Sequence, residues 1–214
     1  LIDAGLVEAT AIADPSQEMA EEARKLAPEA EILPSLEALL DSDIDGLAIA
    51  TPSALHAEQS IAALDRGIAV FCQKPLGRNA LEATAVVEAA RRADRLLGVD
   101  LSYRFTAAMT TIRERITSGA LGTVFAADLV FHNAYGPDKP WFYDKALSGG
   151  GCVMDLGIHL VDLALWTLDF PEVTSVSSNL YSGGKPLESP DQVEDFADAT
   201  LALATGATVR LSCS

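Results

Sequence analysis

Residues 44–75, IDGLAIATPSALHAEQSIAALDRGIAVFCQKP, hold two short apolar runs separated by a helix-like segment. The first run covers residues 44–50 and stops at Thr51-Pro52, and the second covers residues 68–72 and stops before Gln73. Apolar runs that do not alternate with polar residues are typical of strands buried on both faces. With a helix over residues 54–66, this order predicts two neighbouring parallel strands joined by a crossover helix.

The same alternation continues on both sides of this unit. Strands are predicted over residues 7–13, 31–33 and 96–101, and helices over residues 15–26, 35–40 and 79–95. Asp14 is a candidate N-cap for the first of these helices, with Pro15 as its first residue. Residues 1–101 are therefore expected to form an α/β unit with a mostly parallel sheet that helices cover on both faces.

The pattern changes after residue 101. Helices are predicted over residues 106–118 and 152–168, an irregular loop over residues 141–148, and strands over residues 123–132, 173–181, 194–204 and 208–212. Thr205-Gly206, between the last two strands, is a hairpin signal. The second half is therefore expected to be an α+β domain with a mainly antiparallel open sheet. The boundary is predicted near residues 102–105, which gives domains over residues 1–103 and 104–214.

The composition limits the partners and the compartment. The chain of 214 residues has a formal net charge of -16 and three cysteines. This acidity disfavours nucleic acids and anionic membranes as partners, because both carry negative charge. An odd number of cysteines without metal-ligand spacing favours a reducing compartment. No signal peptide and no apolar run long enough to span a membrane stand out, so a cytoplasmic location is expected, with an export signal upstream of Leu1 left open.

Asp14 lies between a predicted strand and a predicted helix. In a dinucleotide-binding unit, an acidic residue at this place accepts hydrogen bonds from the adenosine ribose, about 20 residues after a glycine-rich loop. Only 13 residues precede Asp14, and they contain no such loop. The loop and the first strand are therefore expected upstream of Leu1, and the last strand is expected to continue past Ser214. A simple N-cap is the alternative for Asp14 taken alone.

The predicted helix over residues 152–168 follows three glycines and carries Asp155, His159 and Asp162 among apolar residues. Spacings of four and three residues place these side chains on one face of an α-helix. A carboxylate one turn from an imidazole can hold its tautomer and raise its basicity, as a proton-transfer histidine requires. A surface stripe without a role and a metal site are the alternatives, and the lack of a clear third ligand weighs against the metal.

A second group of polar residues follows the strands of the opening unit. Lys74 comes directly after one predicted strand, and Thr51, Pro52 and His56 come after its neighbour. Ligands of parallel α/β sheets bind at the carboxyl ends of the strands. The ammonium of Lys74 is therefore expected to point into a cleft. Each residue alone is equally compatible with a solvated loop or a packed helix.

Three segments together resemble the Gfo/Idh/MocA oxidoreductases: TPSALHAEQSIAALDRGIAVFCQKPL at residues 51–76, SYRF at residues 102–105 and GGGCVMDLGIHLVDLALW at residues 149–166. The resemblance runs from about Asp14 to Ser214. It implies a partial Rossmann-type domain followed by an α+β domain whose open sheet forms homo-oligomers. It also implies that the protein oxidises or reduces sugars, inositols or related polyols with NAD(P), and no metal is expected.

The resemblance assigns roles to the residues of both groups. Lys74, Asp155 and His159 are the implied catalytic residues, and they also contact the substrate. His159 takes the hydroxyl proton while hydride leaves the same carbon, Asp155 orients and charges the imidazole, and Lys74 stabilises the developing negative charge. Tyr103 and Arg104 are implied near the substrate.

The implied cofactor contacts lie in the first domain, at Asp14, Thr51, Pro52, His56, Gln73 and Lys74. The carboxylate of Asp14 favours NAD over NADP, because it would repel a 2'-phosphate. Gln73 departs from the glutamate that the family usually has there, which keeps an acceptor oxygen but removes the charge. The absent glycine loop is the second departure, since it leaves no obvious cradle for the pyrophosphate.

Two other functions are open at this point. Some relatives of this fold hydrolyse glycosides through transient oxidation by NAD, and others could bind sugars or nucleotides without turnover. The presence of all three implied catalytic residues favours turnover. The substrate is not determined, because the aromatic residues at 141–143 can stack on a sugar ring or pack in the core, and His132-Asn133 has less support still.

Overall fold

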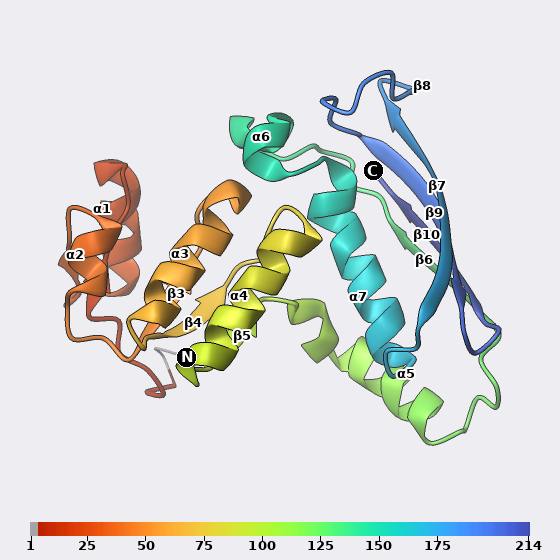
Figure 1. Cartoon of the computed structure of the whole chain (residues 1–214), viewed down its shortest axis with the longest axis horizontal. Coiled ribbons are helices and arrows are strands. Elements are labelled where there is room, and N and C mark those ends of the chain that lie inside the picture. The colour runs from red at the N-terminus through yellow and green to blue at the C-terminus, as the bar shows by residue number, and fades with distance from the viewer. Residues whose placement is uncertain (1–3) are drawn as a thin grey trace.

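The computed structural model describes residues 4–214 of the chain. Figure 1 shows two groups of elements side by side. The first group consists of short strands among helices, and the second is a five-stranded sheet with helices on one face. The chain passes from the first group to the second through the short helix η1 (Ser102–Phe105).

The strands of the first group are all parallel. β1 (Ala11–Ile12) pairs with β2 (Glu31–Ile32), and β4 (Ala69–Cys72) lies between β3 (Gly46–Ile49) and β5 (Leu97–Val99). The intervening helices are α1 (Gln17–Leu26), α2 (Leu36–Leu40), α3 (Ser53–Asp65) and α4 (Ala80–Ala93). The predicted parallel α/β architecture is confirmed, although its strands form two hydrogen-bonded groups rather than one continuous sheet.

The first strand and helix begin differently from the prediction. Pairing with β2 limits β1 to Ala11–Ile12. α1 begins at Gln17, and the hydroxyl of Ser16 caps it by accepting a hydrogen bond from the Met19 amide at 3.4 Å. The carboxylate of Asp14 instead accepts from the Ser16 amide at 2.7 Å. The prediction of Asp14 as N-cap and Pro15 as first helical residue is wrong, because this carboxylate closes the turn before the helix.

The core of the first group lies between the central strands and α3 and α4. Leu64, Val86 and Ala89 have no solvent exposure at all, and they belong to one cluster with Ile49 and Val70 from the strands. α3 ends as predicted at the turn of Gly67, whose φ is +76°. The strand–helix–strand unit of residues 44–75 is therefore the centre of this core.

The second group is a sheet with the strand order β6 (Ala126–Phe131), β10 (Thr208–Cys213), β9 (Phe196–Leu203), β7 (Val173–Ser182) and β8 (Lys185–Pro186). β10 runs parallel to β6, and all other neighbours are antiparallel. The Leu203 amide donates to the Ala207 carbonyl at 2.9 Å across the turn at Gly206. The mainly antiparallel sheet and the hairpin at Thr205-Gly206 are confirmed.

One face of this sheet is covered by helices. α7 (Ile158–Thr167) lies across it and α5 (Ala107–Thr117) packs beside α7, while the opposite face is bare in Figure 1. Leu160 and Ala164 of α7 belong to one buried cluster with Leu201, Val209 and Leu211 of the strands. The helix that carries His159 is thus held by its apolar side against the sheet.

The segment before α7 is more regular than predicted. η2 (Pro140–Tyr143) and α6 (Lys145–Ser148) occupy most of the predicted irregular loop, and the Asp144 carboxylate starts α6 by accepting from the Ala146 amide at 2.9 Å. The loop prediction is wrong here, because elements of four residues leave no periodicity in the sequence. The predicted helix over residues 152–168 is present, but it begins with a π-helical turn, η3 (Val153–Gly157).

The stretch Lys145–Thr167 is long and apolar enough, by length and composition alone, to cross a membrane. No membrane-spanning segment was expected from the sequence. Its α7 part packs on the five-stranded sheet through Leu160 and Ala164. The apolar composition is therefore explained by contact with the sheet, as expected for the core helix of an α+β domain.

Replacing Leu64 by Ala should lower the free energy of unfolding by about 2–5 kcal/mol, because it removes a fully buried side chain from a packed core. Leu81→Ala is the matched control on α4, since Leu81 is 84% exposed and its loss should cost less than about 0.5 kcal/mol. Urea unfolding followed by circular dichroism measures both changes. Equal losses for the two variants would contradict the described core.

Candidate active site

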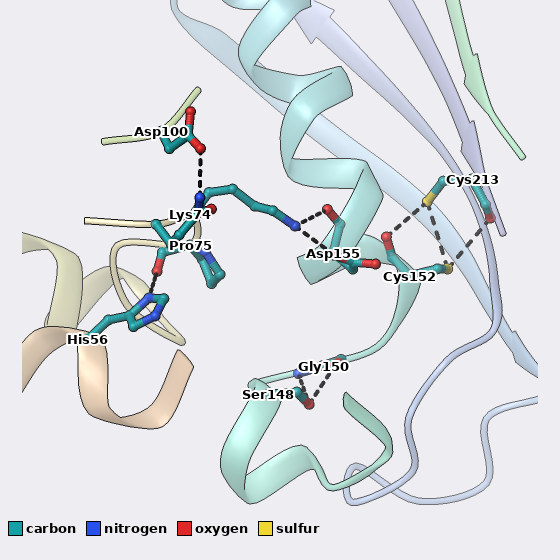
Figure 2. Close-up of polar contacts among 10 residues, drawn as sticks. His56, Lys74, Pro75, Asp100, Ser148, Gly150, Cys152, Asp155 and Cys213 are labelled. Carbon is teal, nitrogen blue, oxygen red and sulfur yellow. Dashed lines mark hydrogen bonds and ion pairs between the residues drawn. The ribbon is translucent and has the colours of Figure 1, made fainter. Parts of the chain in front are cut away.

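A cavity of about 280 Å³ lies where the ends of β3 and β4 face the segment around η2 and η3. Residues that follow the two strands form one wall, and residues from η2 and the glycine-led segment form the other. The residues that line the cavity include Thr51, His56, Gln73, Lys74, Pro75, Trp141, Phe142, Gly150, Gly151 and Asp155. Figure 2 shows Lys74 extending from the first group of elements toward the start of the long helix in the second. Of the predicted helix group, Asp155 lines this cavity together with Lys74 and Thr51, whereas His159 and Asp162 are not among the residues that line it.

The contact between Lys74 and Asp155 joins the two walls. The Nζ atom of Lys74 donates to Oδ1 of Asp155 at 2.6 Å and to the main-chain oxygen of Asp155 at 2.8 Å (Figure 2). Both side chains are largely shielded from solvent, with 17% and 24% exposure. Partial burial strengthens the attraction between the charges, so the ammonium is held in the cavity before any ligand arrives.

His159 lies on α7, four residues beyond Asp155, and is 7% exposed. Its ring meets the ring of Tyr103 edge-on at 4.6 Å between centroids, and its Nδ1 atom is buried without a hydrogen-bond partner. Burial and the nearby charge of Lys74 lower the pKa of His159, and together they outweigh the opposing effect of Asp155, Asp162 and Asp100. The imidazole is therefore neutral at pH 7 and able to accept a proton.

The structure pairs the carboxylates of this helix differently from the expectation. Asp155 binds Lys74, and no hydrogen bond joins it to His159 within the described residues. A π-helical turn holds more residues than an α-helical turn, so Asp155 in η3 is rotated away from the stripe expected for an α-helix. Asp155 acts to raise the pKa of His159, as expected, but burial and the charge of Lys74 outweigh it, so the pKa is lowered overall.

Asp162, the third member of the expected stripe, is paired with Arg104. The Nε atom of Arg104 donates to Oδ2 of Asp162 at 2.8 Å, its Nη2 atom donates to Oδ1, and the guanidinium lies 5.5 Å from the ring centre of Phe170. Arg104 does not line the cavity. Its charge fixes η1 to α7, whereas the neighbouring Tyr103 reaches His159. The expectation that Arg104 contacts substrate therefore has no geometric support here.

The residues that the resemblance assigns to cofactor binding differ in whether they line the cavity. Thr51 lines the cavity and donates through its hydroxyl to Oε1 of Gln59 at 2.7 Å. His56 is 1% exposed, and its ring nitrogens lie 2.7 Å from the carbonyl oxygens of Pro75 and Thr51. His56 thus braces the two loops that follow β3 and β4 instead of offering a nitrogen to a ligand. Pro52 is the N-cap of α3, and Asp14 is exposed after β1.

The contacts of Gln73 explain why this chain has an amide where the family usually has a glutamate. The Nε2 atom of Gln73 donates to Oδ2 of Asp100 at 2.7 Å, between the ends of neighbouring strands β4 and β5. A glutamate at residue 73 would place two carboxylates against each other, and like charges at this distance repel. The amide is therefore the side chain that suits Asp100. Asp100 itself gave no signal in the sequence, because nothing local relates it to Gln73.

The donor set of the cavity fits a nicotinamide dinucleotide. The cavity opens at the carboxyl ends of parallel strands, where α/β sheets bind nucleotides. Pro75 and the stacked rings of Trp141 and Phe142 provide apolar surface, and the side chains of Thr51 and Gln73 provide polar groups beside it. A planar ring that bears an amide matches this combination. Within residues 4–214, no cluster of three or more His, Cys, Asp or Glu side chains is arranged to hold a metal ion.

Other residues that the sequence singled out lie apart from the cavity. Tyr143 is exposed and donates to the Pro137 carbonyl, and His132 is exposed and contacts the hydroxyl of Ser214. The thiols of Cys152 and Cys213 touch at 3.7 Å without a disulfide.

Glu194 is a buried acid beside the glycines that was not predicted from the sequence, because a single acidic residue before a strand carries no signal.

Gln73→Glu should destabilise the full-length protein by about 1–3 kcal/mol at pH 7, because it opposes two partly buried carboxylates. The loss should shrink toward pH 5, since acid protonates one carboxyl of the pair and restores a hydrogen bond. Chemical denaturation at both pH values measures it. The double variant Gln73→Glu/Asp100→Asn is the control and should regain most of the stability at pH 7. A loss that does not depend on pH would contradict the carboxylate contact.

Comparison with known proteins identifies the two halves. A model described as "Oxidoreductase family, NAD-binding Rossmann fold" matches residues 2–101, and one described as "GFO/IDH/MocA C-terminal domain" matches residues 109–214. D-glucoside 3-dehydrogenase of Escherichia coli (strain K12) is 31% identical over 157 residues, which cover 73% of this chain and 45% of that protein. The chain spans about half the length of the curated relatives it matches.

Solved structures of related enzymes agree with this match. GenD2 from gentamicin A biosynthesis, in complex with NAD, superposes with a TM-score of 0.89 at 25% identity and covers 97% of this chain and 58% of that one. Levoglucosan dehydrogenase, in complex with NADH and levoglucosan, superposes with a TM-score of 0.84 at 27% identity and also covers 97% of this chain and 58% of that one. Because the two models together extend over nearly the whole chain, and the fold follows these enzymes throughout, the chain belongs to the Gfo/Idh/MocA family of oxidoreductases.

Proposed function

We propose that the full-length protein is an NAD-dependent dehydrogenase that transfers a hydride between the cofactor and a hydroxyl-bearing carbon of a sugar, inositol or related polyol. The observation that carries this proposal is the Lys74–Asp155 ion pair in the cavity, with a neutral imidazole at His159 on the same helix. The relatives D-glucoside 3-dehydrogenase and levoglucosan dehydrogenase act on compounds of this class, as their names state.

Each of the three residues has a distinct task in this reaction. Bound NAD supplies the acceptor for the hydride. His159 accepts the hydroxyl proton, for which it must be neutral, and its lowered pKa keeps it so. The ammonium of Lys74 hydrogen-bonds the same oxygen and stabilises the negative charge that develops on it. Asp155 holds that ammonium in the cavity through its carboxylate and its main-chain oxygen.

The choice of cofactor and substrate follows from the cavity and its surroundings. Asp14 at the end of β1 favours NAD over NADP, because its carboxylate accepts from ribose hydroxyls and repels a phosphate. The stacked rings of Trp141 and Phe142, 3.9 Å apart between centroids, present an apolar surface in the cavity wall. Such a surface suits the C–H face of a sugar ring. Incubating the full-length protein with NAD and a panel of aldoses, inositols and glycosides tests the proposal through NADH absorbance.

That experiment separates the alternatives. Formation of NADH with a member of the panel supports the dehydrogenase. Cleavage of a chromogenic glycoside without net NADH would replace it by an NAD-dependent glycoside hydrolase. Sugar or NAD binding by calorimetry without any turnover would replace it by a binding protein.

His159→Ala and Lys74→Met should each reduce kcat by about 10²-fold or more, because one removes the proton acceptor and the other removes the charge at the reacting oxygen. Matched controls are His132→Ala and Lys185→Met, since His132 follows β6, Lys185 lies on β8, and both are exposed and do not line the cavity. Steady-state rates of NAD reduction measure all four. Near-normal rates for either His159→Ala or Lys74→Met would remove the assigned role.

The rate of oxidation should fall in acid as His159 becomes protonated. Since the pKa of His159 is below its ordinary value, kcat/KM should be level at neutral pH and should decline only at a pH below the range in which an ordinary histidine titrates. Lys74→Met removes a nearby positive charge, so the pKa of His159 should rise in that variant. A pH profile of kcat/KM and an NMR titration of the His159 ring measure the two effects. A titration unchanged by Lys74→Met would contradict their proximity.

The subunit arrangement and location belong to the same proposal. The uncovered face of the five-stranded sheet carries polar pairs such as Arg210–Asp128 and Asn179–Asp198, and we infer that it forms a homo-oligomer. Light scattering of the full-length protein tests this. A cytoplasmic location is consistent with its need for NAD and with Cys72, Cys152 and Cys213, which are all free thiols.

A further inference from the structure

Glu194 is a buried carboxylate that takes no part in the chemistry described above. It precedes β9 and is 5% exposed, and it is the only acidic residue classed as buried among residues 4–214. A buried carboxylate is costly unless hydrogen bonds compensate it. Its partners therefore show what holds it there.

All of its hydrogen bonds go to the start of the helix that carries Asp155. The Oε1 atom accepts from the Gly151 amide at 2.8 Å and from the Val153 amide at 3.1 Å. The main-chain oxygen of Glu194 accepts from the Cys152 amide at 2.9 Å. Three consecutive amides are thus bound by one residue from a distant part of the chain. Amides at the beginning of a helix also favour a negative charge electrostatically.

The glycines make this approach possible. A Cβ atom at residue 151 would lie 1.8 Å from the main-chain oxygen of Glu194, so no side chain fits there while Glu194 holds its place. A Cβ atom at residue 150 would lie 2.7 Å from the side chain of Met154 and 3.5 Å from Oε1 of Glu194. Gly151 and Glu194 therefore form a fitted pair.

The turn that Glu194 binds, at the start of the helix, places Asp155 in contact with Lys74. Asp155 follows Val153 by two residues and accepts from Lys74 through both its carboxylate and its main-chain oxygen. Because the main chain itself is a partner, the position of the backbone at residue 155 decides the geometry of the ammonium. We propose that Glu194 is a positioning residue that holds Asp155, and through it Lys74, in the reactive arrangement. Its catalytic consequence rests on the proposed dehydrogenase function.

Variants of the full-length protein test this role. Glu194→Met keeps a similar volume but no acceptor, and it should lower kcat about 10- to 100-fold, since small displacements of reacting groups have effects of this size. The KM for NAD should change less than about threefold, because the displaced turn carries Asp155 rather than the residues that bind the ribose. Glu194→Gln retains an oxygen that can accept from both amides, so it should stay within about fivefold of the wild-type kcat. Asp195→Ala is the matched control, because this neighbouring carboxylate binds the Gly183 amide in an exposed turn.

A second readout does not depend on turnover. The 15N-detected resonance of the Lys74 ammonium should show slow proton exchange in wild type and Glu194→Gln, and fast exchange in Glu194→Met. If Glu194→Met does not fold, Gly151→Ala perturbs the same contact from the other side and should release Lys74 in the same way. Should wild type reduce no NAD, the proposed function fails, while the Lys74 signal still decides the role of Glu194.

Two results would overturn the proposal. One is an unchanged Lys74 resonance and kcat in a folded Glu194→Met variant. The other is an equal loss of activity in Glu194→Met and Glu194→Gln that parallels a loss of thermal stability, because that pattern indicates support of the fold alone.

Discussion

The contact between the ammonium of Lys74 and Asp155 is the interaction on which the rest of the site depends. It joins residues 81 positions apart in the chain and spans from the end of β4 to the start of the long helix. A buried ion pair contributes little to stability once its desolvation is included. Its importance here is positional, because it keeps one charged donor in the cavity and ties the two groups of elements to each other at the place where a substrate is expected to react.

The charges around this contact leave a neutral base beside a cation. The chain as a whole has a net charge of -16, and Asp155, Asp162 and Asp100 act to raise the pKa of His159, yet that pKa is lowered overall. Asp155 is engaged by Lys74, and Asp162 is engaged by Arg104. Burial of the imidazole and the charge of Lys74 then dominate. A histidine in this environment is prepared to receive a proton rather than to donate one, which suits the oxidation of an alcohol.

The glycines before the long helix allow another part of the chain to approach the start of that helix closely. Glycines before a helix let a loop or ligand come close to it. In the structure Gly151 is approached by the main chain of Glu194, while Gly150 and Gly151 also line the cavity. The same residues thus connect the sheet to the cavity wall. A side chain at residue 151 would disturb that connection, because it would clash with the main-chain oxygen of Glu194.

The sequence by itself determined the parallel strand–helix–strand unit, the turn at Gly67, the hairpin at Gly206 and the family motifs that contain Lys74, Asp155 and His159. These features depend on neighbouring residues, whose periodicity and turn chemistry are visible in the chain. The tertiary structure alone decided which charged and polar groups pair with each other. Asp155 pairs with Lys74 rather than with His159, Gln73 pairs with Asp100, and Glu194 binds the amides beside Gly151. The physical reason is that such pairings depend on the distance at which separate segments are packed against each other, and no local pattern encodes that distance.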